Sequence, residues 1–318
     1  MMNEPVLSDI LAAHKRIKHF IHKTPVLSSS SINELYGANL YFKCENLQKT
    51  GAFKARGAFN AVYSLADNTA RKGVTTHSSG NHAAALAYAA TTRGIPVTVV
   101  MPSNAPAIKK AAVAAYGANI IYCEPTLQAR EAGVARVVAE TGASLIPPYN
   151  DCRVMAGQAT AAVELLEDVE DLDSVITPIG GGGLISGTAL AAHYINPKIN
   201  IIGAEPQDAN DASRSLLAGR LIPLERADTI ADGLRTSLGD LTFPVIKKYV
   251  NEIVCVSEPQ IIAAMRDIWE RMKIIIEPSS AVALAAVKAK PELFRNKKVG
   301  IILTGGNVDL QTLPWQSK

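Results

Sequence analysis

The segment that decides the fold is "SVITPIGGGGLISGTALAAHYI", residues 174–195. An apolar, β-branched run is followed by four consecutive glycines and then by a stretch rich in alanine and leucine. The first run predicts a buried strand and the last a helix, so the segment is one strand–turn–helix unit. Four glycines leave the backbone amides uncovered at the start of the helix, where they can converge on an anion such as phosphate. The alternative is a merely flexible turn.

The same alternation continues in both directions along the chain. The predicted strands are 40–45, 73–78, 96–102, 119–124, 174–179, 200–205, 252–257 and 299–305. The predicted helices include 82–94, 105–118, 157–169, 187–195 and 261–272. Strands that alternate with helices predict an α/β protein with parallel sheets and right-handed crossovers.

Three strand–helix units fall within residues 73–149 and predict a small domain. Residues 1–72 and 150–318 would then build a larger domain around the glycine segment. Ligands of such sheets bind beyond the carboxyl ends of the strands, so the residues directly after each strand are the place to search for a site.

Composition excludes several classes of function. Of 318 residues, 48% are hydrophobic and 19% charged, and the net charge is +3, which gives no reason to expect a nucleic acid or an anionic membrane as partner. No run approaches a membrane span, and the N-terminus lacks the pattern of a signal peptide. A cytoplasmic location is therefore expected. The four cysteines are too far apart for a metal knuckle; Cys44, Cys123 and Cys255 lie in apolar segments and are predicted to be buried.

Two further polar turns follow predicted strands. The turn "SSGNH", residues 78–82, offers amides and hydroxyls that suit a carboxylate, although a plain helix cap explains part of the pattern. The turn "TGGNVDL", residues 304–310, follows the last strand.

Lys54 lies among small residues and two phenylalanines in "KTGAFKARGAFNA", residues 49–61. It is either a solvated helix lysine or a reactive amine. A lysine, a phosphate turn and a carboxylate turn together suit pyridoxal phosphate acting on an amino acid, because that chemistry begins with a lysine imine. A dinucleotide fold is the rival, with Glu205 as its ribose acid. However, the pattern GxGxxG fails at every register of Gly180–Gly183.

The motifs occur in the order "KTGAFKARGA", "SSGNHAAALA", "PIGGGGLISG", "AEPQDAND", "IEPSSAVA" and "LTGGNVDL". In this combination the chain, from about residue 5 to residue 312, resembles the fold-type II pyridoxal-phosphate enzymes of the serine racemase, serine/threonine dehydratase and threo-3-hydroxyaspartate dehydratase family. The resemblance implies the tryptophan-synthase-β-like fold, with two doubly wound lobes of mostly parallel sheet.

The resemblance assigns roles around the cofactor. Lys54 would hold the cofactor as an imine and carry a proton. The other cofactor residues it implies are Phe53 and Asn81 at the ring, Gly180, Gly181, Gly182 and Gly183 at the phosphate, Glu277 beside the ring and Thr304 at the pyridine nitrogen. Glu277 could instead cap the helix that begins at Pro278, and Thr304 could be a simple turn residue. A neutral hydroxyl at the nitrogen makes the ring a weaker electron sink than a carboxylate would, which suits rapid loss of a β-hydroxyl.

On the substrate side, the resemblance implies that the amino-acid carboxylate meets Ser78, Ser79, Asn81 and His82. Arg130 and Thr236 would face the rest of the substrate, although a surface arginine is an equal alternative for Arg130. Ser79 would lie opposite Lys54 and offer a second acid/base. Racemisation needs one proton carrier on each face, so Ser79 permits that reaction without proving it.

The stretch "EPQDAND" offers carboxylates and a backbone carbonyl at close spacing, as hard cations require. A polar loop with an Asx turn is the alternative. The resemblance implies that Glu205, Ala209 and Asp211 bind Mg²⁺, or Mn²⁺ or Ca²⁺ in its place.

The sequence therefore predicts a pyridoxal-phosphate ammonia-lyase that dehydrates a β-hydroxy amino acid to a 2-oxo acid, with racemase activity as a possible companion. Serine, threonine and threo-3-hydroxyaspartate remain open as substrates. The alternatives are β-replacement, as in cysteine synthases, and a non-catalytic metabolite-binding module. A homodimer is expected.

Overall fold

A computed structural model describes residues 4–316. Its larger sheet has six strands in the order β1-β2-β10-β7-β8-β9. These strands are β1 (Val26–Leu27), β2 (Asn39–Cys44), β7 (Ser174–Pro178), β8 (Asn200–Pro206), β9 (Glu252–Val256) and β10 (Lys298–Leu303). Neighbouring strands are parallel except for β1, which pairs antiparallel with β2. The carboxyl ends of five strands therefore meet at one edge of the sheet.

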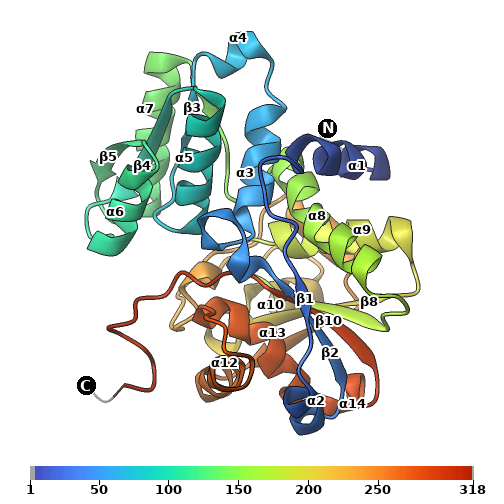
Figure 1. The fold of residues 1–318 in the computed structure, drawn as a ribbon. Helices are drawn as coiled ribbons and strands as arrows, with labels where there is room; N and C mark the ends of the chain where they lie inside the picture. The colour runs from blue at the N-terminus through green and yellow to red at the C-terminus, as the bar shows by residue number, and fades with distance from the viewer. Residues whose placement is uncertain (1–3, 317–318) are drawn as a thin grey trace.

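Helices cover both faces of the larger sheet (Figure 1). The helices packed on one face are α2 (Ser30–Tyr36), α12 (Glu258–Met272), α13 (Pro278–Ala289) and α14 (Pro291–Phe294). The helices on the other face are α8 (Cys152–Asp168), α9 (Gly183–Ile195), α10 (Asp211–Ala218) and α11 (Thr242–Tyr249). Successive residues of β10 show the alternation, because Ile301 belongs to the first core and Ile302 to the second.

The smaller sheet has four parallel strands in the order β5-β4-β3-β6. They are β3 (Val74–Thr76), β4 (Val97–Pro102), β5 (Asn119–Cys123) and β6 (Ser144–Leu145). Its helices are α5 (Asn81–Arg93), α6 (Ala107–Ala115) and α7 (Leu127–Thr141), and a short α4 (Asp67–Ala70) precedes β3. Val99 packs on the side of α5 and Val100 on the side of α7, so this sheet is also doubly wound.

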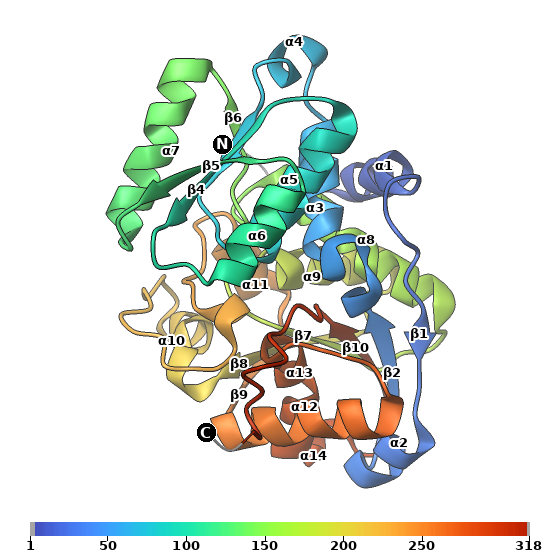
Figure 2. The same ribbon diagram turned by 60° about the vertical axis from the view of Figure 1, so that its left-hand side comes forward.

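Two helices from outside this segment complete the smaller core. Residues of α1 (Leu7–Ile17) and α3 (Lys54–Tyr63) pack with α5 in one hydrophobic cluster. Figures 1 and 2 show α3 running between the sheet of α5 and the body of the molecule. The first residue of α3 is Lys54, so the candidate lysine stands where the two sheets approach each other.

The predicted fold class is confirmed, and all eight predicted strands and five predicted helices are present. The sequence missed β1 and β6, which have two residues each. The burial predicted for Cys123 and Cys255 was wrong, because both lie on edge strands and are half-buried, whereas Cys44 on a central strand is buried. The division at residues 73–149 stays a prediction. Within residues 4–316, no helix is long and apolar enough to cross a membrane.

Candidate active site

Lys54 is held at the start of α3 by contacts from distant parts of the chain. The Phe53 amide donates to the Thr304 carbonyl at 2.9 Å, and Ala52 forms an isolated antiparallel bridge with Gly305. The Lys54 ammonium donates to the Pro148 carbonyl at 2.7 Å and lies 5.0 Å from the centre of the Phe53 ring. The amine is thus fixed beside the end of β10 and the chain that leaves the smaller sheet.

Burial lowers the pKa of Lys54 to about 8, while the Glu277 carboxyl opposes the shift. Desolvation disfavours the charged form of an amine, so a larger fraction of Lys54 is neutral near pH 7 than for an exposed lysine. A neutral amine is the nucleophile that an aldehyde requires.

The four glycines form a tight turn between β7 and α9, and their missing side chains are structurally required. Gly182 has φ +88°, in the left-handed region. A Cβ on Gly181 would lie 2.2 Å from a carbon of the Tyr149 ring, and one on Gly183 would lie 2.9 Å from the Tyr149 Cβ. The Thr242 hydroxyl donates to the Gly181 carbonyl at 2.8 Å. The turn therefore offers bare amides at the N-terminus of a 13-residue helix.

Glu277 and Asn81 are in contact, although they stand at the N-termini of helices that pack on different sheets, α13 and α5. Glu277 is only 4% exposed and stands at the N-cap of α13, but its side chain does not cap that helix. Instead the Asn81 amide nitrogen donates to its two carboxylate oxygens at 3.0 and 3.1 Å. Burial, and next the charge of Asp232, raise the pKa of Glu277 to about 7. Asp232 itself forms an ion pair with Lys109 of α6.

The turn between β3 and α5 contains Ser78 and Ser79, both half-buried. The Ser78 hydroxyl lies 3.4 Å from the Gly80 amide. His82 is buried, its Nε2 lies 2.9 Å from the Ile146 carbonyl, and burial followed by the charge of Lys54 lowers its pKa to about 3. The ring is therefore neutral and its Nε2 proton is already used, so a carboxylate at His82 would have to meet the backbone amide and not the ring.

Tyr149 is in contact with Thr236, one predicted substrate-side residue, and within electrostatic range of Arg130, the other. The Tyr149 and Thr236 hydroxyls lie 2.9 Å apart. Burial, and next the positive charge of Arg130, lower the pKa of His77, and the same charge also acts on Tyr149, so the guanidinium is within electrostatic range of both. Arg130 is half-buried, and its Nε donates to the Thr126 carbonyl of its own helix at 3.3 Å.

Glu205 and Asp211 are 0% and 1% exposed, and Ala209 is equally buried between them. Glu205 accepts from the Ala212 and Ser213 amides at 3.0 and 2.8 Å, and Asp211 from the Leu238 amide at 3.0 Å. Burial raises the pKa of Glu205 to about 8 and that of Asp211 to about 6. Two buried carboxylates whose charges repel are a donor set that suits a hard cation. No group of three or more potential His, Cys, Asp or Glu ligands occurs among residues 4–316, so carbonyls or water would complete any shell.

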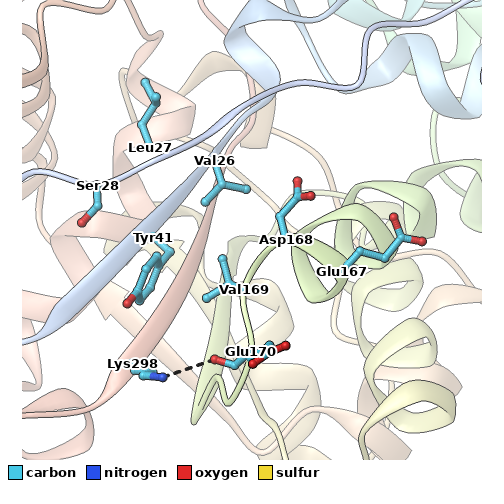
Figure 3. A pocket seen from close by; sticks show the side chains of 9 residues that line it. All are labelled: Val26, Leu27, Ser28, Tyr41, Glu167, Asp168, Val169, Glu170 and Lys298. Carbon is cyan, nitrogen blue, oxygen red and sulfur yellow. Dashed lines mark hydrogen bonds between the residues drawn. The ribbon is translucent and has the colours of Figure 1, made fainter.

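A separate open pocket of about 620 Å³ lies away from these groups, between β1, β2 and the end of α8 (Figure 3). Lys298 at its base donates to the Glu170 carbonyl at 3.4 Å. Lys298 begins β10, so this pocket is at the amino end of a parallel strand, opposite the edge where ligands of such sheets bind.

Comparison with known proteins identifies the family. The family model described as pyridoxal-phosphate dependent enzyme matches residues 17–305. The chain belongs to this family of pyridoxal-phosphate dependent enzymes. It is 54% identical to the beta-hydroxyaspartate dehydratase of Paracoccus denitrificans, covering 98% of this chain and 99% of that protein. It is 52% identical to the serine racemase of Dictyostelium discoideum, with 96% of each chain covered. The structure of maize serine racemase matches with a TM-score of 0.96 at 48% identity, covering 98% of this chain and 96% of that one.

The residues present fit pyridoxal phosphate. Three features lie at the carboxyl ends of β10 and β7. They are a lysine whose pKa is lowered, a glycine turn at a helix N-terminus, and the hydrogen-bonded pair of Asn81 and Glu277. Sequence reasoning missed the residues that connect these groups, namely the Pro148 carbonyl, Tyr149, Asp232 and Asn307. The only signal available was that Asn307 belongs to the polar turn 304–310.

Proposed function

We propose that this protein is a pyridoxal-phosphate ammonia-lyase that converts a β-hydroxy amino acid, preferentially a 3-hydroxyaspartate, to a 2-oxo acid with release of water and ammonia. The observation that carries the proposal is the amine of Lys54, whose pKa is lowered to about 8. This amine donates to the Pro148 carbonyl, and the next residue, Tyr149, packs against the glycine turn. Relatives that span nearly the full chain and are named beta-hydroxyaspartate dehydratase and serine racemase support the reaction class.

When bound, pyridoxal phosphate withdraws electrons from the substrate's α-carbon and makes its proton removable. Lys54 would hold the aldehyde carbon and then act as the base at the α-carbon. The amides of Gly180–Gly183 would hold the phosphate, Phe53 and Asn81 the ring, and Thr304 would face the pyridine nitrogen with a neutral hydroxyl. Glu277, with its pKa raised to about 7, would line the ring pocket beside Asn81.

Ser78, Ser79, Asn81 and the His82 amide would bind the substrate carboxylate at the N-terminus of α5. Arg130 and Thr236 would meet the distal carboxylate that distinguishes 3-hydroxyaspartate from serine and threonine. Support comes from the charge of Arg130 acting on Tyr149, whose hydroxyl contacts Thr236. A second activity, racemisation, is favoured by the Ser79 hydroxyl in this turn, because it supplies a proton carrier that is separate from Lys54.

A divalent cation, Mg²⁺, Mn²⁺ or Ca²⁺, is proposed at Glu205, Asp211 and the Ala209 carbonyl. The support is that the two carboxylates are fully buried, and that the hydrogen-bond donors they meet among residues 4–316 are backbone amides. The homodimer and the cytoplasmic location expected from the sequence stay predictions.

A panel of amino acids tests the proposal, with 2-oxo acid release as the readout. It contains both enantiomers of serine and threonine and the four stereoisomers of 3-hydroxyaspartate. We expect one threo-3-hydroxyaspartate to be the best substrate, and Arg130→Gln to reduce its kcat/KM by at least ~10-fold while serine changes little. Arg136→Gln, on an exposed residue of the same helix, is the control. Absence of oxo-acid release from every member would reject the lyase assignment.

A further inference from the structure

We propose that Asn307 is a positioning residue that fixes the direction of the Asn81 side-chain amide and ties it to the loop that precedes Lys54. Asn307 lies in the turn after β10. Its amide nitrogen donates to the Asn81 Oδ1 at 2.9 Å and to the Thr50 carbonyl at 2.7 Å. A side-chain amide nitrogen has two hydrogens and accepts none, so both of its donors are used in these contacts.

The first contact determines how Asn81 points. Because the Asn81 Oδ1 accepts from Asn307, the Asn81 nitrogen must face Glu277, as it does at 3.0 Å. In the reverse orientation, the Asn81 oxygen would face the Glu277 carboxylate and its nitrogen would face the Asn307 nitrogen. Both contacts would be repulsive, so the orientation with the nitrogen toward Glu277 is the one that Asn307 selects.

The second contact secures a strained loop. Thr50 has φ +58° and Gly51 has φ +71°, and a left-handed threonine persists only where its surroundings hold it. The Gly51 carbonyl accepts from the Gly306 amide at 2.9 Å, and a Cβ on Gly51 would lie 2.5 Å from the Asn307 Oδ1. Asn307 therefore packs on this loop and bonds to it at Thr50, four residues before Lys54.

The consequence rests on the proposed placement of the cofactor ring beside Asn81. With Asn307 in place, the Asn81 nitrogen points toward Glu277, and this donor group would also face the cofactor ring. The charged groups that act on Glu277 are Asp232 and its ion-pair partner Lys109, and Lys54 interacts with it from α3. The Asn307 backbone amide favours the anion of Glu277. Asn307 thus influences the proton affinity of the ring pocket without being a catalytic residue itself.

Two substitutions of the full chain separate orientation from simple loss of a contact. Asn307→Ala removes both hydrogen bonds, whereas Asn307→Asp replaces the donor by an anion that faces two acceptors. We expect Asn307→Ala to weaken cofactor binding by about 3- to 10-fold and Asn307→Asp to weaken it further. We also expect Asn307→Asp, but not Asn307→Ala, to move the midpoint of the pH titration of the cofactor's visible absorption upward, because an added negative charge favours protonation nearby.

Asn104→Asp, a surface change of equal charge, is the matched control and should alter neither readout. Thermal unfolding of the cofactor-free proteins identifies any variant that fails to fold. If Asn307→Asp fails to fold, a double-mutant cycle on cofactor binding decides the inference. We then expect the Asn307→Ala/Asn81→Ala double variant to weaken binding by less than the product of the two single effects. The inference would be overturned if both Asn307 variants lost cofactor affinity equally and the pH midpoint of the visible absorption did not move. It would also be overturned if both variants behaved as the wild type. If Asn81→Ala changes neither readout, the proposed placement of the ring beside Asn81 fails as well. If Asn81→Ala has an effect but the Asn307 variants have none, only the inference about Asn307 is rejected.

Discussion

Replacing Lys54 by methionine should stabilise the cofactor-free protein while abolishing its chemistry. Burial shifts the pKa of Lys54 from 10.5 to about 8. A pKa unit corresponds to 1.36 kcal/mol, so the charged lysine destabilises the folded state near pH 7 by up to about 3 kcal/mol. The substitution also removes the hydrogen bond to the Pro148 carbonyl, which contributes about 1 kcal/mol. After allowance for solvent screening of a half-buried group, we expect a net gain of ~1–2 kcal/mol.

The gain should depend on pH with a definite sign. Above about pH 8 the folded wild type loses the proton on Lys54, whereas the unfolded chain keeps it up to about pH 10.5. Wild-type stability therefore rises relative to the variant across this interval, and the advantage of methionine shrinks. Urea unfolding of both cofactor-free proteins at pH 7 and pH 10 measures it, with Lys15→Met, on an exposed lysine, as control. A less stable Lys54→Met protein at pH 7, or a difference independent of pH, would refute the reasoning.

Three further outcomes are expected. Ser79→Ala should retain dehydration of its L-substrate within about ten-fold while racemisation falls by ~10²–10⁴, as read by chiral chromatography beside oxo-acid release; equal loss of both would show that Ser79 is not a proton carrier. Chelation should lower both activity and melting temperature, and Mg²⁺ should restore both. At 100 times its Kd the ion should add ~2.7 kcal/mol to the free energy of unfolding. A full response to chelator in Asp211→Asn would place the ion elsewhere. Arg56→Met should cost ~3–5 kcal/mol in urea unfolding because it leaves Glu45 and Glu164, 0% and 2% exposed, without their shared cation; a loss below ~1 kcal/mol would contradict this.

The parts of the site that could be predicted from the sequence are those encoded within one short segment. Four glycines between a strand and a helix by themselves indicate a turn whose amides can bind an anion, and the turn "SSGNH" indicates the start of α5. Strands longer than two residues carry enough β-branched character to be recognised, whereas β1 and β6 do not.

The connections between these segments could not be predicted, because they depend on tertiary packing. The Pro148 carbonyl that holds Lys54 is 94 residues away, and Asn307 is 226 residues from Asn81. For the same reason, no sequence pattern shows that the His82 ring turns inward to the Ile146 carbonyl and becomes neutral. Nor does the local sequence reveal that the Glu277 side chain does not cap its helix and instead accepts a hydrogen bond from Asn81.

The central claim, that Lys54 carries the cofactor, is tested most directly by reducing the cofactor-loaded protein with borohydride and mapping its peptides by mass spectrometry. Reduction makes the bond between the cofactor and its lysine permanent. The structure predicts a single pyridoxyl group on Lys54, because this amine has a lowered pKa and donates to the Pro148 carbonyl, next to the residue that packs on the glycine turn. A label on another lysine, such as Lys49 in the preceding loop, or no label on a protein that releases oxo acid, would contradict the account.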